Sequence, residues 1–175
     1  IETFAFRSAD RGHIWEKVPT RFSTPPGFSS VLVDGYPPVQ FPDRTQAVVA
    51  DLDQSTLAFY VTDSNGLAWH YITIVARDEN QRFGRYAYQR LLRLPSGRLQ
   101  CYMVHLAGTR CQTLEMNYSD DGGFSWSTPK PIVRWGESPW TKLPLDQVWK
   151  ESIAGPFYRS PWPLQLADGR IAVIF

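Results

Sequence analysis

Three arginines stand shortly before three apolar segments that have the pattern of hairpins. Arg44, Arg85 and Arg159 come seven to nine residues ahead of the leucine of each hairpin, within Phe41–Thr45, Gly84–Tyr88 and Gly155–Ser160. A guanidinium group donates two parallel hydrogen bonds to a carboxylate and stays charged when it is partly desolvated. If these segments lead into the inner strands of one ring, the arginines can converge on one carboxylate. The alternative is that they are surface residues at strand starts.

The longest connection of the chain, from Pro129 to Phe157, is rich in aromatic and acidic side chains. Long structured loops on rigid scaffolds often carry function, and tryptophan faces beside carboxylates can hold a sugar ring. We therefore expect Trp140 and Trp149 to contact a substrate. The alternative is an insertion that covers the edge of a sheet. The residues of this kind in the loop are Trp135, Glu137, Trp140, Asp146, Trp149 and Glu151.

The elements that would position these residues are marked by a repeated turn pattern, Ser-x-Asp-x-Gly-x-x-Trp. Two copies are complete, and a middle copy keeps a hydroxyl, a hydroxyl, Gly and Trp at the four places. The tryptophans stand 54 and then 57 residues apart, a period that indicates a solenoid, a propeller or an array. The positions are Ser8, Asp10, Gly12 and Trp15; Thr62, Ser64, Gly66 and Trp69; and Ser119, Asp121, Gly123 and Trp126.

Each copy has the chemistry of a tight hairpin turn. An Asp side chain accepts hydrogen bonds from backbone N–H groups that follow it, and a hydroxyl does so more weakly. Glycine supplies the positive φ that such a turn needs. The tryptophan is expected to fold back as an apolar lid whose indole N–H finds a partner.

A second repeat consists of an apolar strand, a turn and another apolar strand. Leu91–Leu99 and Pro163–Ile171 contain Ser-Gly and Asp-Gly turns, which are strong hairpin signals, and Ala47–Tyr60 is a looser version without the glycine. We expect these hairpins to be the first two strands of each propeller blade. The whole chain, 1–175, then forms one region of about three blades that opens and stops within a blade.

Three blades seldom close a ring, since propellers have four to eight. Two interpretations follow. In one, two chains associate head to tail as a homodimer and close a six-bladed ring; in the other, the chain is half of a longer six-bladed protein.

The turn pattern resembles the Asp-box, or bacterial neuraminidase repeat, of the sialidase superfamily. In that family the box joins the third and fourth strands of a blade, on the face away from the active site. The resemblance implies an all-β Asp-box propeller, with three four-stranded blades in this chain as half of a six-bladed ring. It assigns the pattern residues a structural role, with no part in catalysis.

The resemblance also implies a retaining mechanism in which a tyrosine replaces the usual carboxylate nucleophile, because the substrate carries its own carboxylate. The candidates are Tyr88 or Tyr158 as nucleophile, Glu151 as its activator and Asp43 as acid and base. The chain departs from the family at one point. Sialidases commonly place the activating Glu six residues before the hairpin leucine, where this chain has Tyr88 and Ser160.

Taken together, the sequence predicts a sialidase-like glycoside hydrolase whose partner is an acidic sugar or glycan. The alternatives are a non-catalytic carbohydrate-binding or assembly propeller and a polysaccharide lyase on the same fold. No cofactor and no metal site are expected, because His13, His70 and His105 lack metal-ligand spacing. The net charge of +1 does not indicate nucleic-acid binding, and no apolar run is long enough to span a membrane. The resemblance favours a secreted or periplasmic location, although the chain contains no signal peptide.

Overall fold

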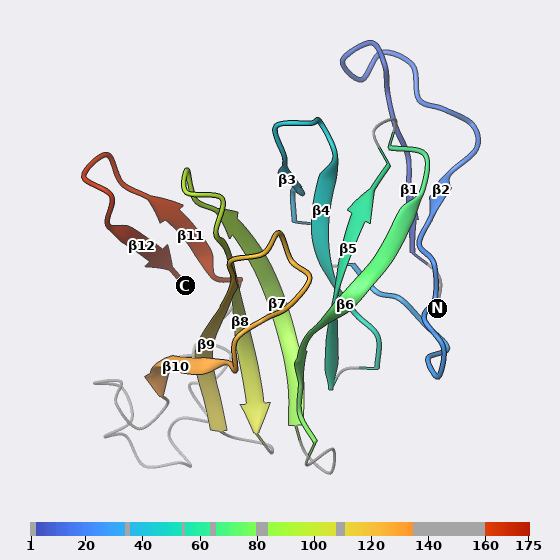
Figure 1. Cartoon of the computed structure of the whole chain (residues 1–175). Helices are drawn as coiled ribbons and strands as arrows, with labels where there is room; N and C mark the ends of the chain where they lie inside the picture. The colour runs from blue at the N-terminus through green and yellow to red at the C-terminus, as the bar shows by residue number, and fades with distance from the viewer. Residues whose placement is uncertain are drawn as a thin grey trace, which may run out of the picture.

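The chain folds into antiparallel β-sheets, with no helix among the residues that the structure describes. A computed structural model describes residues 3–33, 36–53, 55–63, 66–79, 84–107, 111–134 and 160–175. Its strands form two four-stranded sheets and two two-stranded pairs, which lie side by side in a fan (Figure 1). This arrangement is consistent with a β-propeller-like fold, and the all-β prediction is confirmed. Within these ranges, no helix could cross a membrane.

The first sheet has the strand order β3-β4-β5-β6, and the second sheet has the order β7-β8-β9-β10. The β1–β2 pair and the β11–β12 pair lie at opposite sides of the fan (Figure 1). The bounds are β1 Phe4–Ala5, β2 Thr20–Arg21, β3 Val39–Gln40, β4 Gln46–Asp51, β5 Thr56–Thr62, β6 Trp69–Arg77, β7 Gly84–Arg93, β8 Leu99–Ala107, β9 Cys111–Ser119, β10 Lys130–Arg134, β11 Trp162–Gln165 and β12 Ile171–Ile174.

The first sheet is buried on both faces, as β4 shows. Successive side chains of a strand point to opposite faces. Ala47 and Val49 pack into a core cluster that includes Met103 of the second sheet. Val48 and Ala50 belong to a second cluster on the other face, where the segments before β3 pack. A sheet that is apolar on both faces requires a neighbour on each side.

The third copy of the turn pattern closes the β9–β10 connection as its chemistry predicts. Ser119 Oγ donates to Asp121 Oδ1 at 2.7 Å and accepts from Gly123 N at 2.8 Å, and Ser125 N donates to Asp121 Oδ1 at 3.0 Å. The hydrogen bond from the Ser125 hydroxyl, followed by those from the Ser125 N–H and the Ser119 hydroxyl, holds the pKa of Asp121 well below its usual value. Gly123 has a φ of 98°, and the Trp126 indole donates to its carbonyl at 3.1 Å.

In each of the other two copies, a backbone N–H donates to the side chain of an Asp four residues earlier in the chain. Ile14 N donates to Asp10 Oδ1 at 2.8 Å in the first copy. In the middle copy Leu67 N donates to Asp63 Oδ1 at 2.7 Å, so the donor and the acceptor each lie one residue earlier in the pattern than in the other two copies. Ser64 itself lies outside the described residues.

The tryptophans of the second and third copies pack against the neighbouring strands. Trp126 lies edge-on to Phe59 of β5 at 5.6 Å between ring centroids, and Trp69 stacks on Phe22 at 5.0 Å. A Cβ atom placed on Gly123 would overlap the Phe59 ring. Trp15 of the first copy is 58% exposed. The tryptophan of the turn therefore links neighbouring elements in the second and third copies, and it is exposed in the first copy.

The hairpin of the first sheet differs from the prediction. Ala47–Tyr60 does not supply the first two strands, because β4 and β5 are the second and third strands of that sheet. The Thr62–Trp69 turn thus joins the third and fourth strands, as the Ser119–Trp126 turn does in the second sheet.

Phe41–Thr45 is the turn between β3 and β4, not a segment ahead of the innermost strand. Phe41 N donates to the Thr45 carbonyl at 2.9 Å, and Arg44 N donates to the Phe41 carbonyl at 3.0 Å. The same pair of bonds closes the turns at Leu94–Arg98 and Leu166–Arg170. Arg44 has a φ of 72° at the place that glycine occupies in those two turns, which explains why the sequence pattern did not reveal it.

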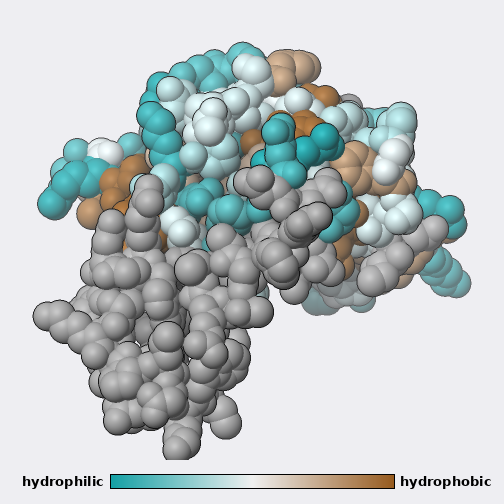
Figure 2. All heavy atoms as spheres, turned by 90° about the horizontal axis from the view of Figure 1, so that it is seen from below, coloured by the Kyte–Doolittle hydropathy of each residue, from teal (hydrophilic) through white to brown (hydrophobic). Residues whose placement is uncertain are grey.

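Apolar surface remains uncovered at the outer pairs of the fan. Phe6 and Ile174 are among the large apolar side chains with exposed surface. Figure 2 shows apolar atoms at the side of the molecule where Figure 1 places the β11–β12 pair.

The contact between Gly123 and Phe59 makes a prediction for stability. Gly123→Ala combines a left-handed backbone with overlap of the Phe59 ring, and we expect a loss of about 2–4 kcal/mol in the free energy of unfolding. Gly122→Ala is the matched control, because Gly122 has a φ of 79° and nothing within 4 Å, so it should lose only about 1 kcal/mol. Urea titration measures both variants, and equal losses would show that the ring contact does not matter.

Candidate functional site

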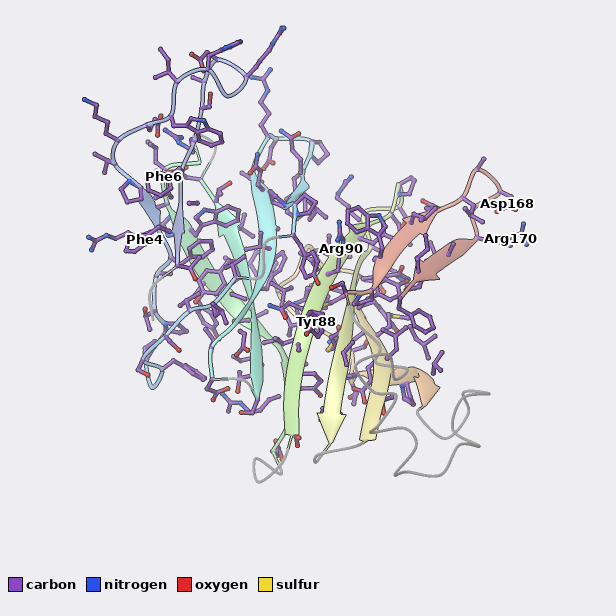
Figure 3. All side chains as sticks on the ribbon, turned by 180° about the vertical axis from the view of Figure 1, so that it is seen from behind. Phe4, Phe6, Tyr88, Arg90, Asp168 and Arg170 are labelled. Atoms are coloured by element: carbon purple, nitrogen blue, oxygen red, sulfur yellow. The ribbon has the colours of Figure 1, made fainter. Side chains whose placement is uncertain are left out.

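The innermost strands of three neighbouring sheets meet around Arg90 of β7. Its side chain is only 6% exposed. The guanidinium carbon lies 3.1 Å from the centroid of the Trp162 ring on β11 and 4.8 Å from that of Tyr36, which precedes β3. Figure 3 labels Arg90 in the middle of the molecule, where β7 lies between β4 and β11. The site is therefore an enclosed cation between two aromatic rings.

The Arg90 guanidinium is buried and only partly hydrogen-bonded within the part of the chain that the structure describes. Its Nη1 atom is buried and has no hydrogen-bond partner among the described residues. Desolvation lowers the pKa of Arg90, and the Tyr36 hydroxyl opposes that shift. Contact with an aromatic face recovers only part of the cost of burying a cation, and a buried charge usually has a counter-charge. This arrangement is suited to an incoming anion.

A left-handed residue lies within β7 and another lies just before β11. Tyr88 has a φ of 56° and Ser160 a φ of 49°. Each stands six residues before the leucine of its hairpin turn, and Gly35 has the same spacing from Phe41. At Tyr88 the pairing of β7 with β8 is interrupted by a bulge between Ala87 and Arg90. Such backbone strain in a bulky residue is a feature of functional sites.

A second polar cluster joins the two large sheets. His105 Nδ1 lies 3.1 Å from Glu115 Oε1, and His105 Nε2 lies 3.1 Å from Asp78 Oδ2. Tyr86 stacks on the imidazole at 4.6 Å. The hydrogen bond with Glu115 is the largest cause that raises the pKa of His105, and the bond with Asp78 adds to it.

Both ring nitrogens of His105 therefore have a carboxylate partner, and both donate when the imidazole is protonated. In the described part of the chain, no group of three or more His, Cys, Asp and Glu side chains could hold a metal ion. We assign this cluster a structural role.

The predicted site residues that the structure describes lie on different elements. Asp43 and Arg44 lie in the β3–β4 turn, at the same end of the sheet as the Thr62–Trp69 turn, since Gln46 N donates to Thr62 Oγ1 at 2.9 Å. The Asp43 carboxylate accepts from the Thr45 hydroxyl at 2.7 Å, which lowers its pKa and fixes the turn. Arg44 of this turn lines a groove together with Tyr36, and no described contact joins the turn to Arg90.

Of the remaining predicted residues, Tyr88 lies on β7 two residues before Arg90, as Figure 3 shows. The backbone of Arg85 belongs to the same strand. The other predicted substrate and catalytic residues lie outside the described residues: Arg159, Tyr158, Glu151, Trp140 and Trp149.

The sequence analysis did not identify Arg90, Trp162 or Tyr36. A signal was present, because Arg90 and Trp162 each stand four residues before the hairpin leucine. Alignment of the inner strands on their turns would have placed both residues at the same level of the ring.

Comparison with known proteins supports the fold. No protein-family model matches the chain, and no curated protein matches it. A crystal structure of a protein of unknown function from Dyadobacter fermentans is similar over 96% of this chain, with a TM-score of 0.69 and 15% identity. A mutant of NanB sialidase from Streptococcus pneumoniae is similar over 73% of this chain, with a TM-score of 0.50 and 14% identity. Both similarities concern the fold of the chain.

The chain spans less than half of both solved structures, covering 42% of the first and 18% of the second. At this level of identity, the sialidase-like fold carries no information about substrate. A proposal about chemistry therefore depends on the residues around Arg90.

The His105 cluster predicts how stability depends on pH. Its raised pKa means that folding favours the imidazolium, so this stabilisation is complete below the ordinary value of 6.5 and is lost as pH rises through the folded pKa. His105→Gln should lower the urea midpoint at about pH 5.5 more than at about pH 8.5. His70→Gln, at an exposed position, is the control; equal effects of His105→Gln at both pH values would contradict this account.

Proposed function

We propose that this protein is a sialidase-like glycoside hydrolase of an acidic sugar, whose carboxylate binds Arg90. The observation that carries the proposal is the enclosed guanidinium, with Nη1 unpartnered among the described residues, between Trp162 and Tyr36. A carboxylate supplies both the missing charge and two acceptor oxygens in one plane.

Access to Arg90 depends on Trp162. Because Nη1 is buried, a carboxylate reaches it only if a covering side chain moves. Trp162 is 49% exposed, so its ring can turn away from Arg90 without losing extensive packing. In the displaced position the Trp162 ring offers an apolar face to the sugar. Arg90 then contacts the sugar carboxylate in place of the Trp162 ring.

Tyr88 is the proposed nucleophile. A substrate that carries a carboxylate at its reacting carbon repels an anionic nucleophile, and a tyrosine hydroxyl avoids that repulsion. The left-handed backbone and the bulge set the direction of the Tyr88 side chain two residues from Arg90. Arg85 and Arg159 are proposed as further carboxylate ligands, with Glu151 as activator; Asp43 is left out because it lies in the β3–β4 turn.

A second function, binding of acidic sugars without hydrolysis, is favoured by one observation. The register position six residues before the hairpin leucine, where sialidases commonly have a Glu, holds Tyr88 and Ser160. Binding needs only the cation and the aromatic rings. The two functions therefore share Arg90 and differ at Tyr88.

Substitution of Arg90 tests the carboxylate binding that the two proposed functions share. Arg90→Gln should weaken binding of N-acetylneuraminic acid about 10- to 100-fold, since charge-assisted hydrogen bonds are lost, and should leave binding of neutral galactose unchanged. Arg170→Gln is the control, because that arginine pairs with Asp168 in an exposed turn. Titration calorimetry measures affinity, and circular dichroism checks the fold. Unchanged acidic-sugar binding in folded Arg90→Gln protein would contradict the proposal.

Substitution of Tyr88 separates the two functions. Tyr88→Phe removes only the hydroxyl, so it should abolish release of 4-methylumbelliferone from a sialoside while acidic-sugar binding stays within about twofold. Full hydrolysis by Tyr88→Phe would rule out this nucleophile. Wild-type protein that binds the sugar and releases no fluorophore would instead establish the binding function.

A further inference from the structure

Gln89 is a buried polar residue in the β7 bulge, between Tyr88 and Arg90, which Figure 3 labels. Its side chain is 3% exposed. The Gln89 Nε2 atom donates to the Val49 carbonyl of β4 at 3.5 Å, and Oε1 is buried with no hydrogen-bond partner among the described residues. A buried polar atom without a partner costs stability, and an apolar side chain would avoid that cost. Such departures from good packing are expected at functional sites.

The bulge gives β7 one residue more than its partner strand. Between Ala87 and Arg90, β7 has two residues where β8 has only Met103. A bulge interrupts the ladder, bends the strand and redirects its side chains. The direction of the Arg90 side chain therefore depends on how the bulge is held, and β8 offers one residue opposite two.

The Val49 carbonyl, which accepts the Gln89 bond, points to the inner edge of β4. The Thr45 and Asp51 carbonyls accept backbone bonds at this edge, at 2.9 and 2.7 Å. In an antiparallel strand every second residue bonds to the same neighbour, so Val49 belongs to the same set as Thr45 and Asp51. Its carbonyl therefore needs a donor from the inner side.

The segment before β3 cannot supply that donor. Counting back from the pairs of β3 with β4 places Pro37 opposite Val49, and proline has no N–H group. Gln89 of the neighbouring sheet donates there instead, and it lines a cavity of about 10 Å³ together with Tyr36 and Val49. One side chain thus links β4 and the Tyr36 segment to the β7 bulge.

We propose that Gln89 is a positioning residue for the Arg90 site. By tying the β7 bulge to β4, it keeps Arg90 between Tyr36 and Trp162. Binding groups are held in a productive geometry by supporting hydrogen bonds of this kind. The effect of Gln89 on sugar binding rests on the proposed function, whereas its effect on the position of Arg90 does not.

Gln89→Met tests the position of Arg90 in the protein without sugar. Methionine keeps the length of the side chain and removes the amide. In wild-type protein the NMR signal of the Arg90 Nε–H group should lie upfield, because the guanidinium carbon is 3.1 Å from the centroid of the Trp162 ring. In Gln89→Met the signal should move toward the ordinary arginine value. An unchanged Arg90 signal in folded Gln89→Met protein overturns the proposal.

Asn117→Leu is the matched control. Asn117 is fully buried, donates from Nδ2 to the Val75 carbonyl of β6 at 2.7 Å, and has a buried Oδ1 atom without a partner among the described residues. Its bond also joins the two large sheets, but through β9 and β6 instead of β7 and β4. Both variants should lower the urea midpoint, and only Gln89→Met should move the Arg90 signal. A similar movement in Asn117→Leu would show that weaker sheet packing alone displaces Arg90, and it would overturn the proposal.

Sugar binding separates this inference from the proposed function. In titration calorimetry, Gln89→Met should weaken binding of N-acetylneuraminic acid about 10-fold, and Asn117→Leu should stay within about twofold of wild type. Equal binding by wild-type protein and Gln89→Met overturns the proposal. If the wild-type chain binds no acidic sugar, the proposed function fails, while an Arg90 signal that moves in Gln89→Met still supports the positioning role.

The wild-type chain offers a measurement that does not depend on the folding of a variant. The side-chain amide protons of Gln89 should exchange slowly with solvent, because the amide is buried and bonded to β4. Slow exchange supports the link between the two sheets. Rapid exchange of these protons in wild-type protein overturns it.

Discussion

Burial of both faces of the first sheet is the constraint on which the rest of the structure depends. β4 directs Ala47 and Val49 toward the second sheet and Val48 and Ala50 the other way. Each large apolar side chain that is buried contributes about 1.5–3 kcal/mol, which a lone sheet cannot recover. The sheets must therefore stand side by side, and a fan of antiparallel sheets follows.

The same constraint gives the turns and the inner strands different tasks. The Ser-x-Asp-x-Gly-x-x-Trp turns carry the contacts between neighbours, since Trp126 packs on Phe59 and Gly123 leaves room for that ring. The inner strands approach one another at the centre. There Arg90 is enclosed because Trp162 and Tyr36 come from the sheets on either side. A buried guanidinium whose Nη1 has no hydrogen-bond partner among the described residues is the feature on which the proposed chemistry depends.

The sequence predicted the parts of the fold that depend on local chemistry. The turns at Ser8–Trp15 and Ser119–Trp126 form because Asp, Ser and Gly satisfy the backbone within a few residues. The β3–β4 turn was missed because Arg44 takes a left-handed conformation that usually indicates glycine. Ser64 lies outside the described residues, and Asp63 accepts from Leu67 N, with donor and acceptor each one residue earlier in the pattern than in the other two copies.

The candidate site could be predicted only in part. Tyr88 was a candidate nucleophile from the family resemblance, and this role stays a prediction; its place on β7, two residues before Arg90, follows from the local sequence of one strand. Arg90 acquires its character from residues more than fifty positions away in both directions, Tyr36 before it and Trp162 after it. Only the three-dimensional arrangement of three sheets shows that its charge is enclosed.

The measurement that tests the central claim most directly is an NMR titration of the arginine side chains with an acidic sugar. Signals of the Arg90 guanidinium, assigned with Arg90→Lys, should shift and become protected from exchange as N-acetylneuraminic acid is added. The same signals should stay unchanged with a neutral sugar, since a neutral sugar offers no carboxylate to the buried cation. An Arg90 signal that ignores the acidic sugar at saturating concentration would contradict the account.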